Sequence, residues 1–175
     1  MSLQNCLLSG GYTLGCSQTG GVNRVWIGNY EQISAYTQDN CGIITGITPT
    51  SAITVYEFAQ DIQTASLVQT GSYDRSAGTV FYESVLSIKL FGLDCTVRNL
   101  LVELGRSPLM AVVESNSGEF YYCGISSAGR TTTGEANLGL NLGDMNGASI
   151  SISWLSPDGV FVLDPALLGT TILIG

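Results

Sequence analysis

The chain has 175 residues, of which 14 are acidic, 6 are basic and none is histidine, so its formal net charge at pH 7 is −8. Charged residues make up 11% of the sequence, compared with about 25% in an average soluble domain. The acidic balance argues against a protein that grips nucleic acid through its phosphates, and the lack of histidine excludes the usual forms of Ser-His-Asp and Cys-His catalysis.

The N-terminal segment, residues 1–21, is rich in Gly, Ser, Thr and Gln and shows no periodic pattern. We therefore expect an arm that leads into the first strand. Because no basic region precedes an apolar stretch there, no secretory signal is expected, and the protein is expected to stay in the cytoplasm in which it is made.

The five cysteines form no CxxC pair and the chain has no histidine, so a structural metal site is not expected. Cys95 and Cys123 lie in apolar stretches and are predicted to be buried thiols. Cys6 and Cys16 flank a glycine-containing stretch and can pair only under oxidising conditions.

The first predicted strand covers residues 22–29, which include Val25, Trp26 and Ile27. Residues 34–51 follow without a stable period, and we expect a long loop that holds at most a short strand near 42–47. A loop of this length inside a compact domain is usually functional or takes part in interactions.

Three strands are predicted after this loop. Residues 53–58 are rich in β-branched and aromatic side chains, and residues 65–71 offer a partner strand. Residues 78–91 alternate between apolar and polar side chains, which is typical of a long, half-buried strand. Only Ser84 interrupts its apolar face, which comprises Val80, Tyr82, Leu86, Ile88 and Leu90.

One helix is predicted, with Asp94 as its N-cap. Gly105 fits the position just after the helix, and Pro108 prevents its continuation. The apolar side chains at helical spacing, which form one face, are Val97, Leu100, Leu101 and Leu104.

The last third of the chain returns to short strands separated by turn residues. Residues 126–134 are polar and are expected to form a loop, whereas Asn146-Gly147 within 144–147 is a strong signal for a hairpin turn. Further turns are expected at 115–118 and 157–159. The predicted strands are 109–114, 119–123, 135–142, 148–155 and 160–163.

This order of elements predicts a mainly β fold, a β-sandwich or small barrel with one flanking α-helix at about 94–105. We expect residues 22–163 to form the domain, between an N-terminal arm at 1–21 and a C-terminal arm at 164–175. The apolar tract at 166–174 is too short for a membrane span, which takes about 20 residues.

No set of residues predicts a catalytic, cofactor-binding or metal site. Glu114 and Glu119 face each other across a predicted hairpin, as a glycosidase pair would, but a solvated strand end explains them equally well. Residues 144–147 lack the length and closing glutamate of a calcium loop and fit a hairpin turn better. Core or subunit-interface packing fits the following aromatic residues better than stacking on sugars or bases: Trp26, Tyr56, Tyr82, Tyr121 and Tyr122.

Several segments resemble the tail tube (major tail) proteins of tailed bacteriophages. In the second half these are residues 107–114, 118–124 and 131–134, followed by a Gly-Asp-x-Asn-Gly turn into a closing strand at 143–152. Near the start, residues 20–27 resemble the opening strand of such proteins. The likeness covers about residues 20–163, and the cysteine-containing N-terminal stretch departs from the pattern.

The resemblance implies a β-sandwich with a flanking helix that assembles into hexameric rings, which stack into a hollow tube. It implies that residues 34–51 form a stacking loop and that residues 1–19 and 166–175 act as arms between rings. DNA would pass through the acidic lumen without specific binding, and other virion proteins would be partners. Candidates for the lumen lining are Glu57, Asp61, Asp74, Glu83 and Asp144.

Composition points the same way, because a surface with so few charges is expected to be covered by other protein, above all by copies of itself. The sequence therefore predicts a virion structural protein that is not an enzyme and is assembled in the host bacterial cytoplasm. Three alternatives remain open: another virion ring or decoration protein (neck, tail terminator or head decoration), a carbohydrate-binding sandwich, and a hydrolase that uses carboxylates alone.

Overall fold

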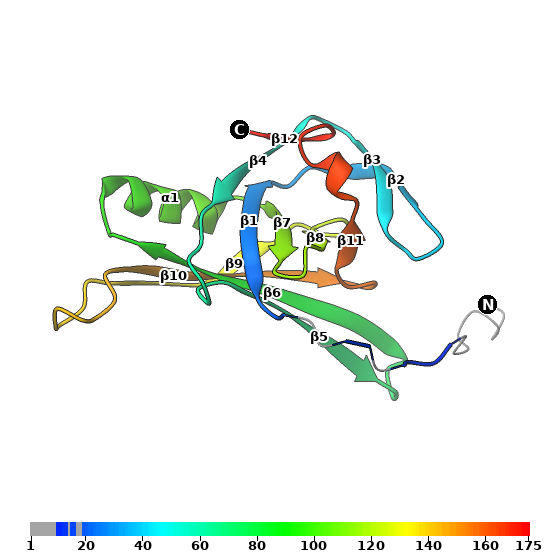
Figure 1. Ribbon diagram of the computed structural model, residues 1–175, viewed down its shortest axis with the longest axis horizontal. Helices are drawn as coiled ribbons and strands as arrows, with labels where there is room; N and C mark the ends of the chain where they lie inside the picture. The colour runs from blue at the N-terminus through cyan, green and yellow to red at the C-terminus, as the bar shows by residue number, and fades with distance from the viewer. Residues whose placement is uncertain (1–9, 14, 17–18) are drawn as a thin grey trace.

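A computed structural model of the protein describes residues 10–13, 15–16 and 19–175 (Figure 1). Two β-sheets face each other, and one helix lies beside them, so the predicted mainly β sandwich with one flanking helix is confirmed. The larger sheet is curled and has the order β12-β4-β1-β7-β8-β11-β3-β2. Its strands are β1 (Val22–Asn29), β2 (Ile33–Gln38), β3 (Ile44–Pro49), β4 (Ile53–Phe58), β7 (Leu109–Ser115), β8 (Phe120–Cys123), β11 (Phe161–Leu163) and β12 (Ile172–Ile174).

The smaller sheet has four strands in the order β5-β6-β10-β9, and every neighbouring pair is antiparallel. These strands are β5 (Ser66–Asp74), β6 (Thr79–Phe91), β10 (Gly147–Ser156) and β9 (Arg130–Asn137). The remaining elements are the helix α1 (Cys95–Arg106) and the short 3₁₀ helix η2 (Pro165–Leu167). Among the described helices, none is long and apolar enough to cross a membrane.

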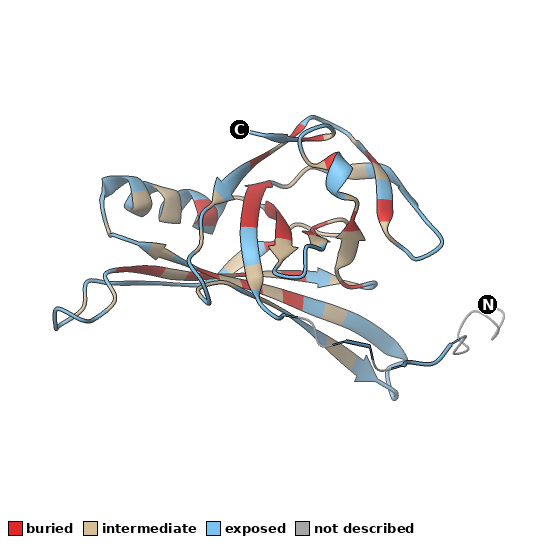
Figure 2. Ribbon diagram, in the orientation of Figure 1, coloured by how far each residue is buried: buried red, intermediate tan, exposed pale blue. Residues whose placement is uncertain are grey.

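The central strands of the larger sheet are buried on both faces (Figure 2). In β1, Val25 and Ile27 join a cluster between the two sheets, whereas Trp26 joins a second cluster within the curled sheet. A strand covered on both sides needs apolar residues in succession, which explains the run of buried residues in β1 and β7. The inter-sheet cluster also contains side chains from the smaller sheet, namely Leu86, Ile88, Ile150, Ile152 and Trp154.

The alternation in β6 is confirmed in its second half, where Leu86 and Ile88 are buried and Ser84 takes the interrupting position on the same face. Val80, at the beginning of the strand, is exposed instead. The reason is the pairing, because β10 ends opposite Tyr82 and leaves the first residues of β6 paired with β5 alone. The β5–β6 hairpin therefore projects beyond the sandwich (Figure 1).

The helix begins as predicted, with the Asp94 carboxylate accepting a hydrogen bond of 2.8 Å from the Val97 backbone N–H. The predicted end of the helix was wrong: Gly105, expected just after the helix, lies within it, and Ser107 is the C-cap. Ser107 has an extended backbone, which is the conformation that a following proline favours.

The segment 34–51 was predicted to be a long loop, but most of it belongs to a β-hairpin made of β2 and β3. Its turn is held by the Asp39 carboxylate, which accepts hydrogen bonds from the backbone N–H groups of Cys41 and Ile43 at 2.8 and 2.9 Å. The strand predicted near 42–47 lies two residues further on. Because β2 is an edge strand with mostly exposed side chains, it carries no alternating apolar signal.

The predicted boundary between a loop and a strand at residue 135 was also wrong. The predicted polar loop at 126–134 contains the start of β9, and the predicted strand at 135–142 ends at Asn137. The β-branched residues Thr131–Thr133 pair with β10, as threonine does readily in strands. Leu138, Leu140 and Leu142, which belong to the predicted strand, lie in the connection from β9 to β10, where they face solvent.

The C-terminal segment 164–175 does not form a free arm. Its strand β12 pairs in parallel with β4, and Ile172 and Leu167 are buried in the cluster of the curled sheet. At the other end of the chain, the described residues before Val22 are exposed, and the amide Nδ2 of Asn116 donates a hydrogen bond of 2.8 Å to the Gly20 carbonyl. The rest of the predicted N-terminal arm, residues 1–9, 14 and 17–18, lies outside the described residues.

Candidate assembly surface

The carboxylates considered for catalysis each have a partner of their own. Glu114 forms an ion pair with Arg24, with 3.1 Å between Oε2 and Nε, and Glu119 accepts a hydrogen bond of 2.7 Å from the Tyr121 hydroxyl. That hydrogen bond raises the pKa of Tyr121. Glu114 therefore links β7 to β1, Glu119 is engaged at the β7–β8 hairpin, and nothing in their geometry forms an acid–base pair.

The cysteines divide by exposure. Cys123 is buried, as predicted, and burial raises the pKa of its thiol to about 12. The prediction for Cys95 was wrong, because the first residue of α1 faces solvent. Cys6, one half of the considered pair, lies outside the described residues. Within the described ranges, no group of three or more His, Cys, Asp or Glu side chains is placed to hold a metal ion.

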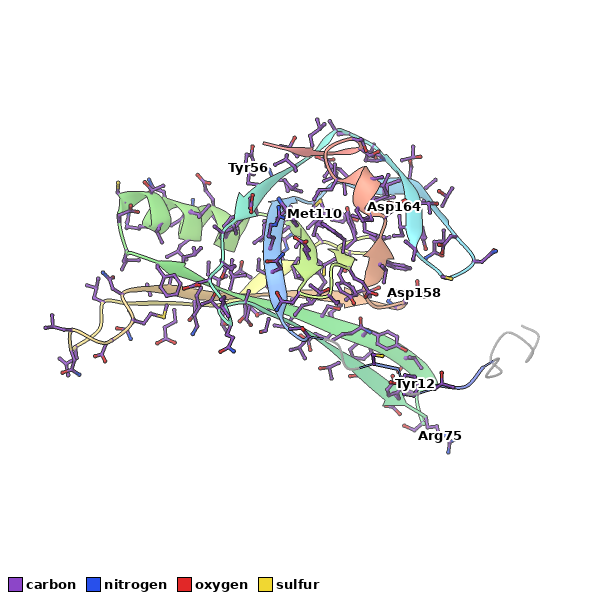
Figure 3. All side chains as sticks on the ribbon, viewed as in Figure 1. Tyr12, Tyr56, Arg75, Met110, Asp158 and Asp164 are labelled. Atoms are coloured by element: carbon purple, nitrogen blue, oxygen red, sulfur yellow. The ribbon has the colours of Figure 1, made fainter. Side chains whose placement is uncertain are left out.

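The aromatic residues are divided between the core and the surface. Trp26 and Tyr122 are buried, and Trp26 stacks on Phe120 with ring centroids 6.0 Å apart, which confirms core packing for these residues. Tyr56 is exposed beside β12, on the opposite side of the molecule from the β5–β6 turn, where Figure 3 labels Arg75. The other exposed rings of the described chain are spread over several elements, and one of them, Tyr73, contacts Tyr82 edge to face on the β5–β6 hairpin, with ring centroids 6.1 Å apart.

Both edges of the four-stranded sheet are open. No described strand pairs with the outer edge of β5, which has nine residues, or with the outer edge of β9, which has eight. Unpaired backbone N–H and C=O groups along such edges are ready to pair with another chain. Because the four strands alternate in direction, β5 and β9 run in opposite senses, and β9 of one copy would meet β5 of a rotated copy in antiparallel orientation.

One face of this sheet is covered by neither the larger sheet nor the helix (Figure 1). The register places small hydroxyl side chains there in cross-strand rows, for example Ser66, Ser87 and Ser151 together with Thr133. The hydroxyls of Ser87 and Ser151 lie 3.0 Å apart, within hydrogen-bonding distance. We refer to this surface as the hydroxyl face, which comprises Ser66, Thr70, Ser72, Thr79, Ser87, Thr133, Ser149, Ser151 and Ser153.

Few charges interrupt the hydroxyl face. Glu83 lies on it and accepts a hydrogen bond of 2.8 Å from the Ser153 hydroxyl. Glu135 and Lys89 occupy one cross-strand row on either side of Ser149, Arg130 lies opposite Ser153, and Asp74 lies at the end of β5. The face is therefore mildly acidic, and between its hydroxyl groups it also carries exposed apolar side chains, namely Val68, Phe81 and Leu155.

The structure brings only two of the five lumen candidates, Asp74 and Glu83, to this face. Glu57 lies in β4 of the other sheet, and Asp61 lies in the connection between β4 and β5. Asp74 also stabilises the hairpin turn, because hydrogen bonds from the Ser76 hydroxyl and from the backbone of Ala77 and Ser76 lower the pKa of its carboxyl. The remaining candidate, Asp144, has a local role in the β9–β10 connection, described below.

Three groups of exposed apolar side chains stand out, and others, among them Ile62, Val68, Phe91 and Leu155, lie outside these groups. One set lies on the projecting β5–β6 hairpin and comprises Tyr73, Val80 and Phe81. A second set lies at the β4–β12 edge of the curled sheet and comprises Tyr56, Leu173 and Ile174. The third set lies in the β9–β10 connection and comprises Leu138, Leu140 and Leu142. The first and third sets occupy opposite ends of the long axis of the molecule (Figure 1).

Sequence reasoning did not identify the hydroxyl face, although a signal was present. Ser149, Ser151 and Ser153 alternate with apolar residues in β10, which identifies a strand with one polar face. The other rows of the face come from strands that pair over long sequence distances, and single-strand alternation does not show which strands those are.

The comparisons with known proteins add no assignment to this geometry. The chain matches no known protein-family model, and no curated protein shows significant similarity to it. A function has to be inferred from the open edges, the hydroxyl face and the exposed apolar sets themselves.

Proposed function

We propose that the protein is a self-assembling virion structural protein, a tail tube subunit whose copies join into rings that stack around a DNA-conducting lumen. The observation that carries the proposal is the four-stranded sheet with two long, open and oppositely directed edges. The resemblance to tail tube proteins, with its hexameric rings, supports the same reading. The proposed role requires no catalysis and no cofactor.

The ring follows from pairing β9 of one subunit with β5 of the next. The pairing is head-to-tail, so each subunit uses two different edges, and a closed ring leaves none of them open. The curled sheet and α1 occupy one side of the four-stranded sheet, which leaves only the hydroxyl face free to line the lumen. The ring would therefore have a continuous inner β-wall with the rest of each subunit outside it.

The hydroxyl face suits a wall past which DNA must move. DNA binds proteins mainly through basic groups on its phosphates, and Lys89 is the chain's one lysine. On this face the acidic groups Asp74, Glu83 and Glu135 outnumber the basic groups Lys89 and Arg130, so phosphates would be weakly repelled. Small hydroxyl side chains keep the surface wet without offering deep contacts.

Stacking of rings would use the remaining apolar sets and the edges of the curled sheet. Its two edge strands, β12 and β2, are also open in the described chain. Leu173 and Ile174 are exposed on the first of these edges, and Tyr36 is partly exposed on the second. Because β12 belongs to the domain, we propose that its exposed side chains, rather than a free arm, make the contact between rings.

Negative-stain electron microscopy of the purified protein tests the proposal. Long hollow tubes with a regular axial repeat are expected. Single rings or trimers would instead favour a neck, terminator or decoration role, and a stable monomer at high concentration would contradict all of these roles. A carbohydrate-binding module is less well supported, because the two exposed rings on the uncovered sheet face, Phe81 and Phe91, lie near opposite ends of β6 and do not form a platform together.

A further inference from the structure

The connection between β9 and β10, residues 138–146, presents three leucines to solvent. Leu138, Leu140 and Leu142 are 69%, 94% and 110% exposed, relative to a reference fully accessible residue. We call this segment the leucine loop. In Figure 1 it projects beyond the end of the sheet.

The conformation of the leucine loop is fixed from within. The Asp144 carboxylate accepts hydrogen bonds from the backbone N–H groups of Asn141 and Leu140 at 2.7 and 2.9 Å. These bonds lower the pKa of Asp144. Gly139 has a φ of +74°, and a side chain there would come within 2.7 Å of the Asp144 Cβ atom. The hydrogen bonds of Asp144 thus fix the loop in a conformation in which its leucine side chains point into solvent.

Exposed leucines of this kind are suited to association. Burying one leucine side chain changes an association constant by about ten- to a hundredfold, and the leucine loop offers three of them side by side. The surface that receives them has to be apolar and has to lie within reach of the end of β9.

The opposite edge of the same sheet has a step at the matching end. β5 begins at Ser66, opposite Ser87, so the last residues of β6, from Ile88 to Phe91, extend past it. At the other edge the sheet keeps its full length. Gly147 of β10 pairs with Phe91 on one side and with Asn137 of β9 on the other, so Asn137 lies level with Phe91. β5 is therefore shorter at this end by four positions, which lie level with residues 134–137 of β9, and the leucine loop continues β9 beyond the end of the step.

A turn of the β4–β5 connection borders this step and exposes an apolar side chain. Ile62 is 85% exposed, and its backbone N–H donates a hydrogen bond of 2.7 Å to the Asp61 carboxylate. The turn is tied to β6 by Gln60, whose side-chain oxygen accepts a hydrogen bond of 3.1 Å from the Lys89 backbone N–H. Phe91, at the end of β6, is 58% exposed. Ile62 and Phe91 thus flank the step.

We propose that the leucine loop of one subunit packs at the open end of this step on the neighbouring copy, against Ile62 and Phe91, while residues 134–137 of β9 occupy the step itself. The inference rests on the proposed ring, in which β9 pairs with β5 of the next subunit. Since those strands run antiparallel, the end of β9 lies beside the beginning of the neighbour's β5. The contact gives each ring interface an apolar anchor next to the paired backbone.

Site-specific photocrosslinking tests the contact directly. A benzoylphenylalanine at position 140 is irradiated in the assembled protein, and the crosslinked peptides are identified by mass spectrometry. Attachment to residues 59–65 or 88–91 of a second copy is expected. Attachment to other residues of a second copy, or only within one chain, would overturn the proposal.

A substitution in the leucine loop measures how much the contact contributes to assembly. L140S is expected to raise the critical concentration for assembly about tenfold or more while leaving the melting temperature of the monomer unchanged. V102S is the matched control, because Val102 is an exposed apolar residue on α1, outside both the leucine loop and the step. Tubes formed by L140S at the wild-type concentration would overturn this inference and leave the proposed function standing. Failure of the wild-type protein to assemble at all would overturn both.

Discussion

The two isoleucines of β12 separate the stability of the fold from its assembly. Ile172 is completely buried against the curled sheet, whereas Ile174, two residues further along the same strand, is 52% exposed. Alanine at either position removes the same side-chain atoms and changes β-propensity by the same amount. The difference between the two variants therefore isolates burial.

For Ile172→Ala we expect a loss of about 2–5 kcal/mol in the free energy of unfolding, which is the usual range for isoleucine-to-alanine changes in a core. In a domain of this size each kcal/mol shifts the melting temperature by about 2–4 °C, so the midpoint should fall by about 4–20 °C. For Ile174→Ala the expected loss is below about 1 kcal/mol, because exposed positions contribute little.

Urea unfolding of both variants, at protein concentrations too low for assembly, gives the two free energies. Similar losses for the two variants would refute the packing of β12 against β4, and with it the conclusion that the C-terminal segment belongs to the domain. Tube formation by Ile174→Ala, followed by microscopy, then reports on the proposed contact between rings. We expect shorter tubes from a variant whose monomer is as stable as the wild type.

Three further predictions address the loop, the lumen and the thiols. Asp144→Asn should speed hydrogen exchange at the Leu140 and Asn141 amides, and the same loosening should appear in the wild type at low pH. Because the folded pKa of Asp144 is depressed, its stabilisation is complete above the ordinary value of about 3.9 and is lost as the pH falls through the lower folded value; no change on acidification would contradict this role. Tubes of Glu83→Lys that are assembled with short duplex DNA should retain the DNA at low salt, because the new lysine faces the lumen. Tubes of Glu57→Lys, a change in the other sheet, should not retain it. Equal retention by both variants would contradict the assignment of the lumen face. In the native protein a maleimide reagent should label Cys95 readily and Cys123 only after unfolding, and mass spectrometry showing early labelling of Cys123 would contradict its burial.

The sequence predicted those elements whose pattern is produced by burial on one or both faces. β1, β4 and most of β6 have apolar residues where the two clusters require them, and α1 has both an N-cap and an apolar face. In these segments local propensity and tertiary packing agree, so the pattern in the sequence and the structure coincide.

The predictions of secondary structure were wrong where a single side chain, outside the hydrophobic pattern, binds the backbone and sets its conformation. Alternating leucines at 138–142 imitate a strand, but Asp144 folds that segment into a loop by accepting its backbone N–H groups. Asp39 closes the β2–β3 turn in the same way, inside a segment whose edge strand is too exposed to alternate. Asx-type turns of this kind compete with regular structure and leave only weak traces in periodicity.

The candidate assembly surface was less predictable than the fold. Its composition was visible as scarce charge and frequent hydroxyl residues, and Ser149–Ser153 show the alternation of one strand. Its location depends on pairings between distant segments, such as Ser151 with both Ser87 and Thr133. The parallel pairing of β12 with β4 joins segments more than 110 residues apart and has no local signal at all.

The central claim is that β9 of each subunit pairs with β5 of the next, so that the hydroxyl faces line a lumen. Cryo-electron microscopy of the assembled protein, at a resolution that shows side chains, tests it most directly. The account predicts a closed inner β-wall in which strands β5-β6-β10-β9 repeat around the ring, with Ser87 and Ser151 facing the lumen. An assembly whose inner wall is built from the curled sheet or α1, or in which β5 and β9 remain unpaired, would contradict it.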